Sequence, residues 1–252
     1  MRRLAVATGC ALVAALAAGC SSVVLGTAKP APNLKPRPLF GRTVEHVLLD
    51  GKLLSRMLGQ PLVARQPTKF GGAERLDQRE APAESADCMG VVAMLQKSVY
   101  DSAGVRNVAS VSWWNDGDPA QVISVMQGVV ALPSAAQAQE LFATFPEQWQ
   151  RCTGQTTTEE AGPISTTTVI GDVRTMGSVI AATNTATATL PNMPALQPTP
   201  QARAIGVRMN CIVEVEIVFF GDRQPSDPGS ADPDTSAVDV AQAMMEKVSD
   251  LS

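Results

Sequence analysis

Residues 212–220 carry a period of two that constrains the fold more than any other stretch of the chain. Successive side chains of an extended strand point to opposite faces. One face therefore holds four apolar residues, Val213, Val215, Ile217 and Phe219. Glu214 and Glu216 fall on the other face, where two carboxylates could in principle perform acid–base chemistry. Nothing in the pattern indicates burial, so a solvated sheet face is the interpretation we adopt.

Further strands and helices indicate the fold class. Residues 203–209 form a second strong strand, and residues 110–114 and 121–132 flank an Asn-Asp-Gly-Asp turn that predicts a β-hairpin. Residues 43–58 and 235–251 show the three-and-four spacing of amphipathic helices. Helices at both ends and one between groups of antiparallel strands predict an α+β fold.

The central helix is predicted at residues 134–151. Ser134 and Gln137 can form a capping box, and Pro146 should kink or restart the helix. An apolar stripe follows the helix through Ala138, Leu141, Phe142, Phe145 and Trp149. Such a stripe is typical of a core, and a ligand cavity lined by it is the alternative.

The first twenty residues resemble a bacterial lipoprotein leader. Arg2 and Arg3 precede a short apolar run, and small residues stand immediately before Cys20. We expect residues 1–19 to be a signal peptide and the Cys20 thiol to be lipidated, with palmitate among its acyl chains. Ordinary secretion with a coincidental Cys is the alternative. Lipidation would place the protein on the outer face of the cell membrane.

A Pro-rich segment follows the anchor, so residues 20–38 are expected to be a lipidated Cys with a semi-extended tether, and residues 39–252 a single domain. Of the five Cys, only Cys88, Cys152 and Cys211 then remain in the exported domain. An odd count in an oxidising compartment implies one disulfide and one thiol, or an intermolecular bond.

Charge and His content exclude several functions. The chain has 20 basic and 24 acidic residues, for a net charge of −4, whereas nucleic-acid binding requires clustered Lys and Arg. A three-His zinc site or a paired-His helix cannot be built from the single His. We therefore expect no nucleic acid, no metal, no cofactor and no catalytic residues. A hydrolase that uses Ser or carboxylates is a minor rival.

Several short motifs, in this order, resemble the family of PknH-like extracellular sensor domains, which occur on mycobacterial serine/threonine kinases and as stand-alone lipoproteins. The motifs are Cys88-Met89-Gly90, Ser98-Val99-Tyr100, the run from Gln127 to Ala135, the run from Trp149 to Gly154, and the run from Ala204 to Val215 around Asn210. The resemblance spans about residues 39 to 250. It implies a small α+β domain with a twisted antiparallel sheet, a cleft, and a binding or sensing role outside the cell.

The resemblance also bears on the cysteines. Members of the family typically carry two disulfides, and the first maps onto Cys88 and Cys152. The second does not map, because only Cys211 remains, and we expect Cys211 to be a buried, inert thiol.

We interpret the chain as a non-enzymatic, lipid-anchored envelope lipoprotein whose domain binds a small ligand, a glycan or an envelope protein. The alternative is a carrier of apolar envelope lipids, with Phe142, Phe145 and Trp149 lining its cavity. A carrier needs a deep apolar pocket, whereas a sensor cleft should be open and mixed in polarity. Because aromatic and Arg side chains dominate binding hot spots, the candidate ligand-binding residues are Tyr100, Arg106, Trp113 and Trp114.

Overall fold

The structure is a computed structural model that describes residues 36–78, 86–118, 120–221 and 231–252. The predicted signal peptide, the predicted lipidation site Cys20 and the predicted tether up to residue 35 lie outside these residues. The remainder of the chain, Pro36–Ser252, forms one unit.

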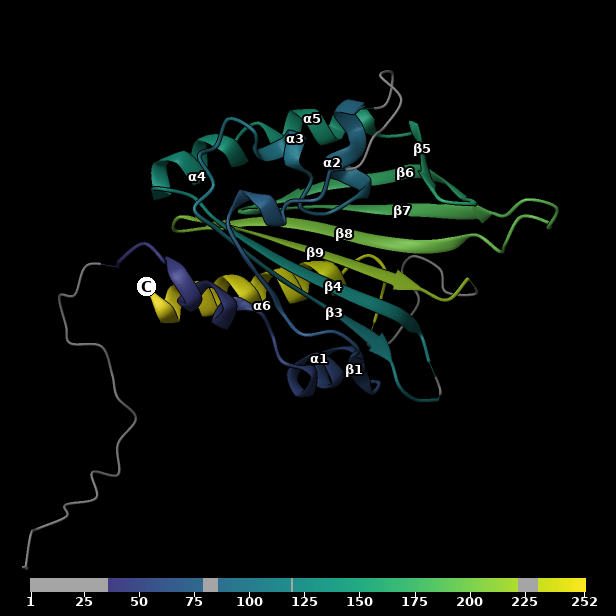
Figure 1. Ribbon diagram of the computed structural model, residues 1–252, viewed down its shortest axis with the longest axis horizontal. Helices are drawn as coiled ribbons and strands as arrows, with labels where there is room; N and C mark the ends of the chain where they lie inside the picture. Colours follow the sequence, from purple (N-terminus) through teal and green to yellow (C-terminus); the bar gives the residue numbers. More distant parts are fainter. Residues whose placement is uncertain (1–35, 79–85, 119, 222–230) are drawn as a thin grey trace, which may run out of the picture. The chain divides into compact units, whose positions relative to one another are not determined.

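Within the described residues, nine strands form one antiparallel sheet in the order β1-β3-β4-β9-β8-β7-β6-β5, and β2 also pairs with β3 (Figure 1). Many of the strands are rich in Val, Ile and Thr, whose branched side chains fit an extended backbone. The predicted hairpin and the two C-terminal strands are confirmed. The strands are β1 Leu62–Ala64, β2 Lys69–Gly71, β3 Asn107–Asn115, β4 Val122–Ala131, β5 Thr156–Ala161, β6 Ile164–Met176, β7 Val179–Thr189, β8 Thr199–Arg208 and β9 Cys211–Phe219.

Helices cover both faces of the sheet (Figure 1). On one face, α6 packs on β7, β8 and β9, and the 3₁₀ helix η2 packs on β3 and β4. On the other face, α2 and α5 contact β6, and α4 contacts β8 and β9. None of the helices in the described ranges is both long and apolar enough to cross a membrane. The helices are η2 Gly41–Val47, α1 Gly51–Leu58, η3 Ala73–Arg75, η4 Ala86–Cys88, α2 Met89–Val92, α3 Lys97–Tyr100, α4 Ala135–Phe142, α5 Phe145–Cys152 and α6 Ser236–Leu251.

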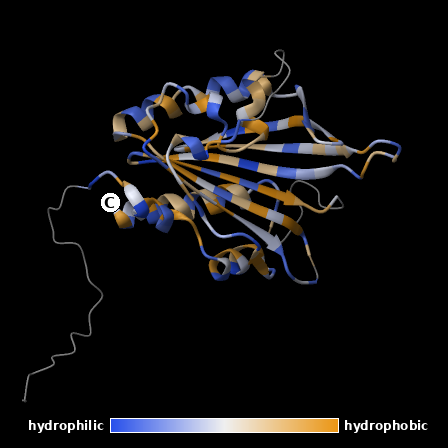
Figure 2. Ribbon diagram, in the orientation of Figure 1, coloured by the Kyte–Doolittle hydropathy of each residue, from blue (hydrophilic) through white to orange (hydrophobic). Residues whose placement is uncertain are grey.

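Two hydrophobic cores lie on opposite faces of the sheet. Val213, Val215 and Ile217 belong to the core under α6, whereas Ile212 belongs to the core under α2–α5. Figure 2 shows hydrophobic residues concentrated along the central strands β4 and β9. The central strands are therefore buried on both faces, which confirms the α+β architecture and places a polar residue such as Glu214 in an apolar layer.

The helix boundaries follow from local chemistry. The Gln137 backbone N–H donates to Ser134 Oγ at 3.2 Å, which confirms the predicted cap of α4. The predicted break near Pro146 is also confirmed, because α4 ends at Phe142 and α5 begins at Phe145 with the proline in its first turn. The cap and the break therefore determine where α4 and α5 begin on their face of the sheet.

Cys88 and Cys152 form a disulfide that joins η4 to the end of α5, with their Cα atoms 5.7 Å apart. The pairing that the family resemblance implied is therefore present. Cys211 is a free, buried cysteine at the start of β9. Burial raises the pKa of the Cys211 thiol to about 12.

We expect thiol labelling of the non-reduced, folded domain at neutral pH to modify Cys211 only when the protein is unfolded. The thiolate is the reactive form, and a pKa of about 12 leaves almost none of it at neutral pH, even where reagent could enter. Intact mass before and after denaturation measures this. One added label after denaturation is expected for the domain from residue 39, and three labels would contradict the disulfide.

Candidate functional site

A cleft of about 310 Å³ opens beside β3 and β4, on the sheet face that also carries α2–α5. Its walls come from three separate parts of the chain: the segment 66–77, the segment 94–95, and strands β3 and β4. The residues that line it are Gln66, Pro67, Lys69, Arg75, Leu76, Asp77, Met94, Leu95, Ser110, Val111, Ser112 and Met126. Its volume is at the lower end of the range for small-molecule sites.

The cleft arises from a gap in the strand pairing along β3. Strand β1 pairs with β3 from Trp113 to Asn115, and β2 pairs with β3 from Val108 to Ser110. Residues 65–68 leave the sheet between these two ladders. The outer edge of β3 at Val111 and Ser112 is consequently unpaired in the described ladders, and both residues line the cleft.

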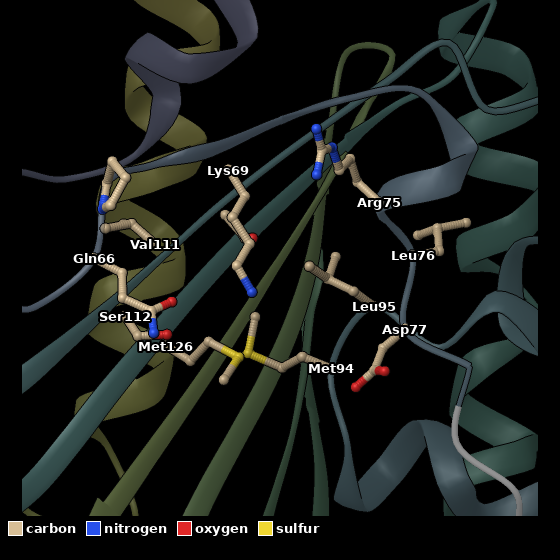
Figure 3. Close-up of a pocket in the computed structure, with 12 residues that line it drawn as sticks. Gln66, Lys69, Arg75, Leu76, Asp77, Met94, Leu95, Val111, Ser112 and Met126 are labelled. Atoms are coloured by element: carbon tan, nitrogen blue, oxygen red, sulfur yellow. The ribbon is translucent and has the colours of Figure 1, made fainter.

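Two cationic side chains come from the wall formed by β2 and η3. Figure 3 shows the Lys69 side chain extending into the cleft, and its ammonium has no hydrogen bond or ion pair with the described residues. Arg75 Nε donates to the Phe70 carbonyl at 3.1 Å, which holds the guanidinium at this wall. The neighbouring Glu74 carboxylate lies close to the Arg75 side chain, and its Oε1 accepts the Gly72 N–H at 2.8 Å. That hydrogen bond lowers the pKa of Glu74.

The opposite wall is mainly apolar. Figure 3 shows Met94 and Met126 pointing toward one another, with Asp77 on the far side of the cleft from Lys69. Leu95 has a left-handed backbone, with φ of 56°, and lies on the sheet directly over Gly128. A Cβ atom at Gly128 would stand 2.9 Å from a Leu95 methyl carbon, so this close approach requires glycine. Such strain in a cleft wall needs support from its surroundings.

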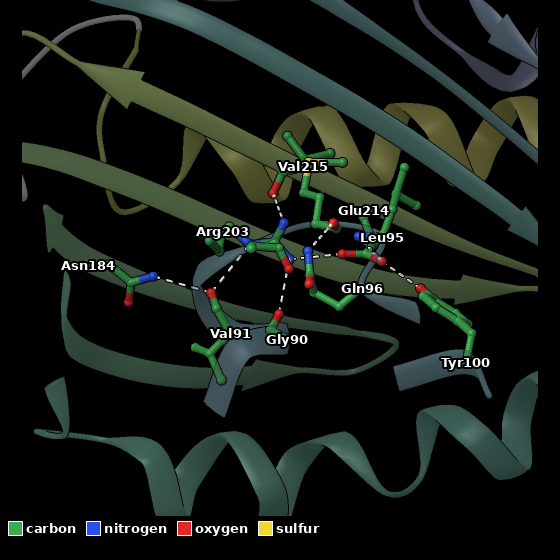
Figure 4. A network of polar contacts seen from close by, with 11 residues as sticks. Gly90, Val91, Leu95, Gln96, Tyr100, Asn184, Arg203, Glu214 and Val215 are labelled. Atoms are coloured by element: carbon green, nitrogen blue, oxygen red, sulfur yellow. Dashed lines mark hydrogen bonds and ion pairs between the residues drawn. The ribbon is translucent and has the colours of Figure 1, made fainter. Parts of the chain in front are cut away.

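The support comes from a buried ion pair beneath the wall (Figure 4). Arg203 on β8 donates from Nη2 to Glu214 Oε2 on β9 at 2.8 Å, and both side chains are almost fully buried. The same guanidinium donates to the backbone carbonyls of Val215 at 2.8 Å and Gly90 at 3.1 Å. Its Nε donates to the Val91 carbonyl at 3.3 Å. One buried cation therefore links carbonyls of α2 and β9 to the Glu214 carboxylate.

Glu214 connects this ion pair to the cleft. Its Oε1 accepts the Leu95 backbone N–H at 3.1 Å and the Tyr100 hydroxyl at 2.6 Å. Burial, and then the negative charge of Glu214, raise the pKa of Tyr100 well above its usual value, so the phenol stays protonated and donates. The expectation of a solvated face at Glu214 is wrong, because the segment from α2 to α3 covers this face and leaves the residue 2% exposed.

The structure does not bring the four predicted ligand-binding residues together. Tyr100 is 1% exposed and belongs to the buried network, whereas Arg106 is exposed just before β3. Trp113 is partly buried against the start of α1, on the opposite sheet face from Tyr100. Trp114 is 39% exposed. None of the four lines the cleft, and their role in binding stays a prediction.

The residues that do line the cleft were missed by sequence reasoning. Lys69 and Arg75 come from a polar, glycine-bearing stretch with no periodicity, and β2 has only three residues. The one available signal was Ser110 and Ser112, which alternate along a predicted strand and so share a face.

The aromatic stripe of α4 and α5 belongs to the core. Phe142 and Phe145 meet edge to face with centroids 6.1 Å apart, and the Arg203 guanidinium lies 5.9 Å from the Trp149 ring centroid. These rings are buried and do not line the cleft. Among the described residues, no group of three or more His, Cys, Asp or Glu could hold a metal ion.

Comparisons with known proteins fit this geometry. The family model for the PknH-like extracellular domain matches residues 40–247. The serine/threonine-protein kinase PknH of Mycobacterium tuberculosis is 28% identical over 153 residues, which are 58% of this chain and 24% of the kinase. The kinase PknH of Mycobacterium bovis is 26% identical over 153 residues, which are 61% of this chain and 25% of the kinase. The matched region is thus about a quarter of each kinase.

A solved structure shares the fold. The crystal structure of the extracellular domain of PknH from Mycobacterium tuberculosis superposes with a TM-score of 0.68 at 20% identity. The superposition covers 85% of this chain and 98% of that domain. The mixed sheet-and-helix architecture described above is therefore found in a crystallised extracellular domain.

Proposed function

Because this chain belongs to the family of PknH-like extracellular domains, we propose that it is the ligand-binding, sensor-like domain of a lipid-anchored lipoprotein on the outer face of the cell membrane. The proposed activity is binding, not catalysis. Among small ligands, glycans and envelope proteins, the size of the cleft favours a small molecule or a short part of a larger one.

The observation that carries the proposal is the mixed polarity of the cleft. Cationic, hydroxyl and thioether groups line it together, and the buried ion pair supports the wall that carries Leu95. Such preorganisation lowers the entropic cost of binding. A carrier of apolar lipids would instead need a deep apolar pocket, and the aromatic stripe that could have formed one is packed in the core.

The anchor rests on the sequence. Small residues precede Cys20, and the leader before it is too short to serve as a lasting membrane span. Two or three acyl chains on Cys20 would hold the domain firmly, because a single chain binds membranes only marginally. The domain would then meet its ligand outside the cytoplasm.

Native mass spectrometry of the protein extracted from its own envelope tests both parts of the proposal. The measured mass should equal that of a chain that begins at Cys20 plus its acyl chains. A small molecule should also remain bound to the folded domain. Replacing Ser112 with Trp should remove that molecule, because the indole fills the cleft beside Met126.

Ser124→Trp is the matched control. Ser124 lies on the same sheet face, two positions from Met126, but does not line the cleft, so this variant should keep the molecule. Circular dichroism confirms that both variants fold. A molecule retained equally by Ser112→Trp would remove the cleft from the proposal, and an unacylated chain would remove the anchor.

A further inference from the structure

The cleft presents cationic groups on a protein that is acidic overall. The whole chain carries a net charge of −4, whereas the charged residues of the cleft are Lys69, Arg75 and Asp77, which sum to a positive charge. Lys69 has no ion pair among the described residues, and the Glu74 carboxylate, which lies close to Arg75, is not among the residues that line the cleft. A positive site in a negative surface attracts an anion over the surrounding surface.

The hydroxyl groups of the floor extend this polar end. Ser110 and Ser112 point from β3 toward the helical layer and make no side-chain hydrogen bond with the described residues. Ser110 stands directly opposite Lys69 across the β2–β3 ladder. Lys69, Arg75 and Ser110 thus line the β2 side of the cleft, and Ser112 stands opposite Met126 on β4. Carboxylate or phosphate oxygens can accept hydrogen bonds from these groups.

Apolar groups line the cleft as well. Leu76 and Leu95 are buried, and the side chains of Met94 and Met126 point toward one another (Figure 3). Methionine side chains adapt to irregular apolar shapes. The volume of about 310 Å³ equals that of about ten liquid water molecules. The cleft can therefore hold roughly ten heavy atoms of a ligand.

We propose that the cleft binds an amphipathic anion, with its carboxylate or phosphate at Lys69 and Arg75 and its short apolar chain on Met94 and Met126. This inference rests on the proposed function of the cleft and names the chemical class of its ligand. The charged group of the ligand stays hydrated on the side that faces solvent. Its apolar chain displaces water from the methionine side chains.

Methionine methyl NMR with defined probes tests the proposal. Octanoate and octyl phosphate, each below its micelle concentration, should shift the Met94 and Met126 methyl signals in a saturable way. The exposed Met176 and Met193 methyls report non-specific binding and should stay unchanged. Octanol and octyltrimethylammonium carry the same chain without the negative charge and should bind at least tenfold more weakly. A preference between the two anions distinguishes a carboxylate ligand from a phosphate ligand.

Charge-removing variants complete the test. Lys69→Gln and Arg75→Gln should each weaken octanoate or octyl phosphate binding about tenfold, whereas Lys52→Gln, at an exposed lysine of α1 away from the cleft, should not. Equal shifts with octanol would overturn the anion assignment and leave the cleft as a binding site. If none of the probes shifts the Met94 and Met126 methyl signals, this inference is overturned. A co-purified molecule that is lost in Ser112→Trp would still support the proposed function.

Discussion

Replacing Arg203 with Met should lower the free energy of unfolding by about 3 to 5 kcal/mol, the usual result of removing one partner from a buried ion pair. The loss is large because Glu214 then keeps a buried charge without its cation. The carbonyls of Gly90 and Val215 also lose their donor. Since domains of this size are stable by only about 5 to 15 kcal/mol, this change removes a large share.

Urea unfolding followed by circular dichroism measures the effect. Arg151→Met is the matched control, because Arg151 pairs with Glu147 on an exposed face of α5 and should contribute less than about 1 kcal/mol. The double variant Arg203→Met/Glu214→Gln should be more stable than the sum of the two single losses predicts. Equal unfolding midpoints for Arg203→Met and Arg151→Met would contradict the structural role of the pair.

Replacing both Cys88 and Cys152 with Ala should lower the free energy of unfolding by about 4 kcal/mol in the chain-entropy model, because the disulfide spans a sequence separation of 64 residues. The unfolded chain becomes more expanded without the bond, so the dependence of unfolding on urea should also steepen. Both quantities come from one unfolding curve recorded on non-reduced protein.

Cys211→Ala is the control for the loss of buried sulfur, because Cys211 is buried and bonded to no other cysteine. It should cost about 1 kcal/mol, as expected for a small cavity. Were the double variant to unfold at the wild-type midpoint, the bond would not contribute to the stability of the domain. A loss confined to signals from α5 and the segment 88–97 would show local rather than global stabilisation.

The strands and long helices could be predicted because their periodicity is local. The alternation in β9 identifies which side chains share a face, and the cap at Ser134 identifies where α4 starts. Alternation does not tell what covers each face. Arg203 and Tyr100, the partners of Glu214, lie 11 and 114 residues away in the sequence, so burial of this carboxylate was invisible before the fold was known.

The cleft was hidden for a related reason. Its cations belong to a three-residue strand and a single 3₁₀ turn, which are too short to produce a periodic pattern. Residue type alone marks Tyr100, Trp113 and Trp114 as binding candidates, but Trp113 is partly buried and packs against the core on the α6 face of the sheet. Composition identifies residues that can bind, but topology decides which of them meet.

Because β1 and β2 pair separately with β3, the length of the connection between them, residues 65–68, sets the width of the cleft. Residues added or removed between Ala64 and Lys69 change the opening, while each short strand keeps its own register. Length changes in a surface connection cost little free energy compared with changes in a core. A change of length at this one connection can therefore reshape the cleft, and the sheet, the disulfide and the buried ion pair remain as they are.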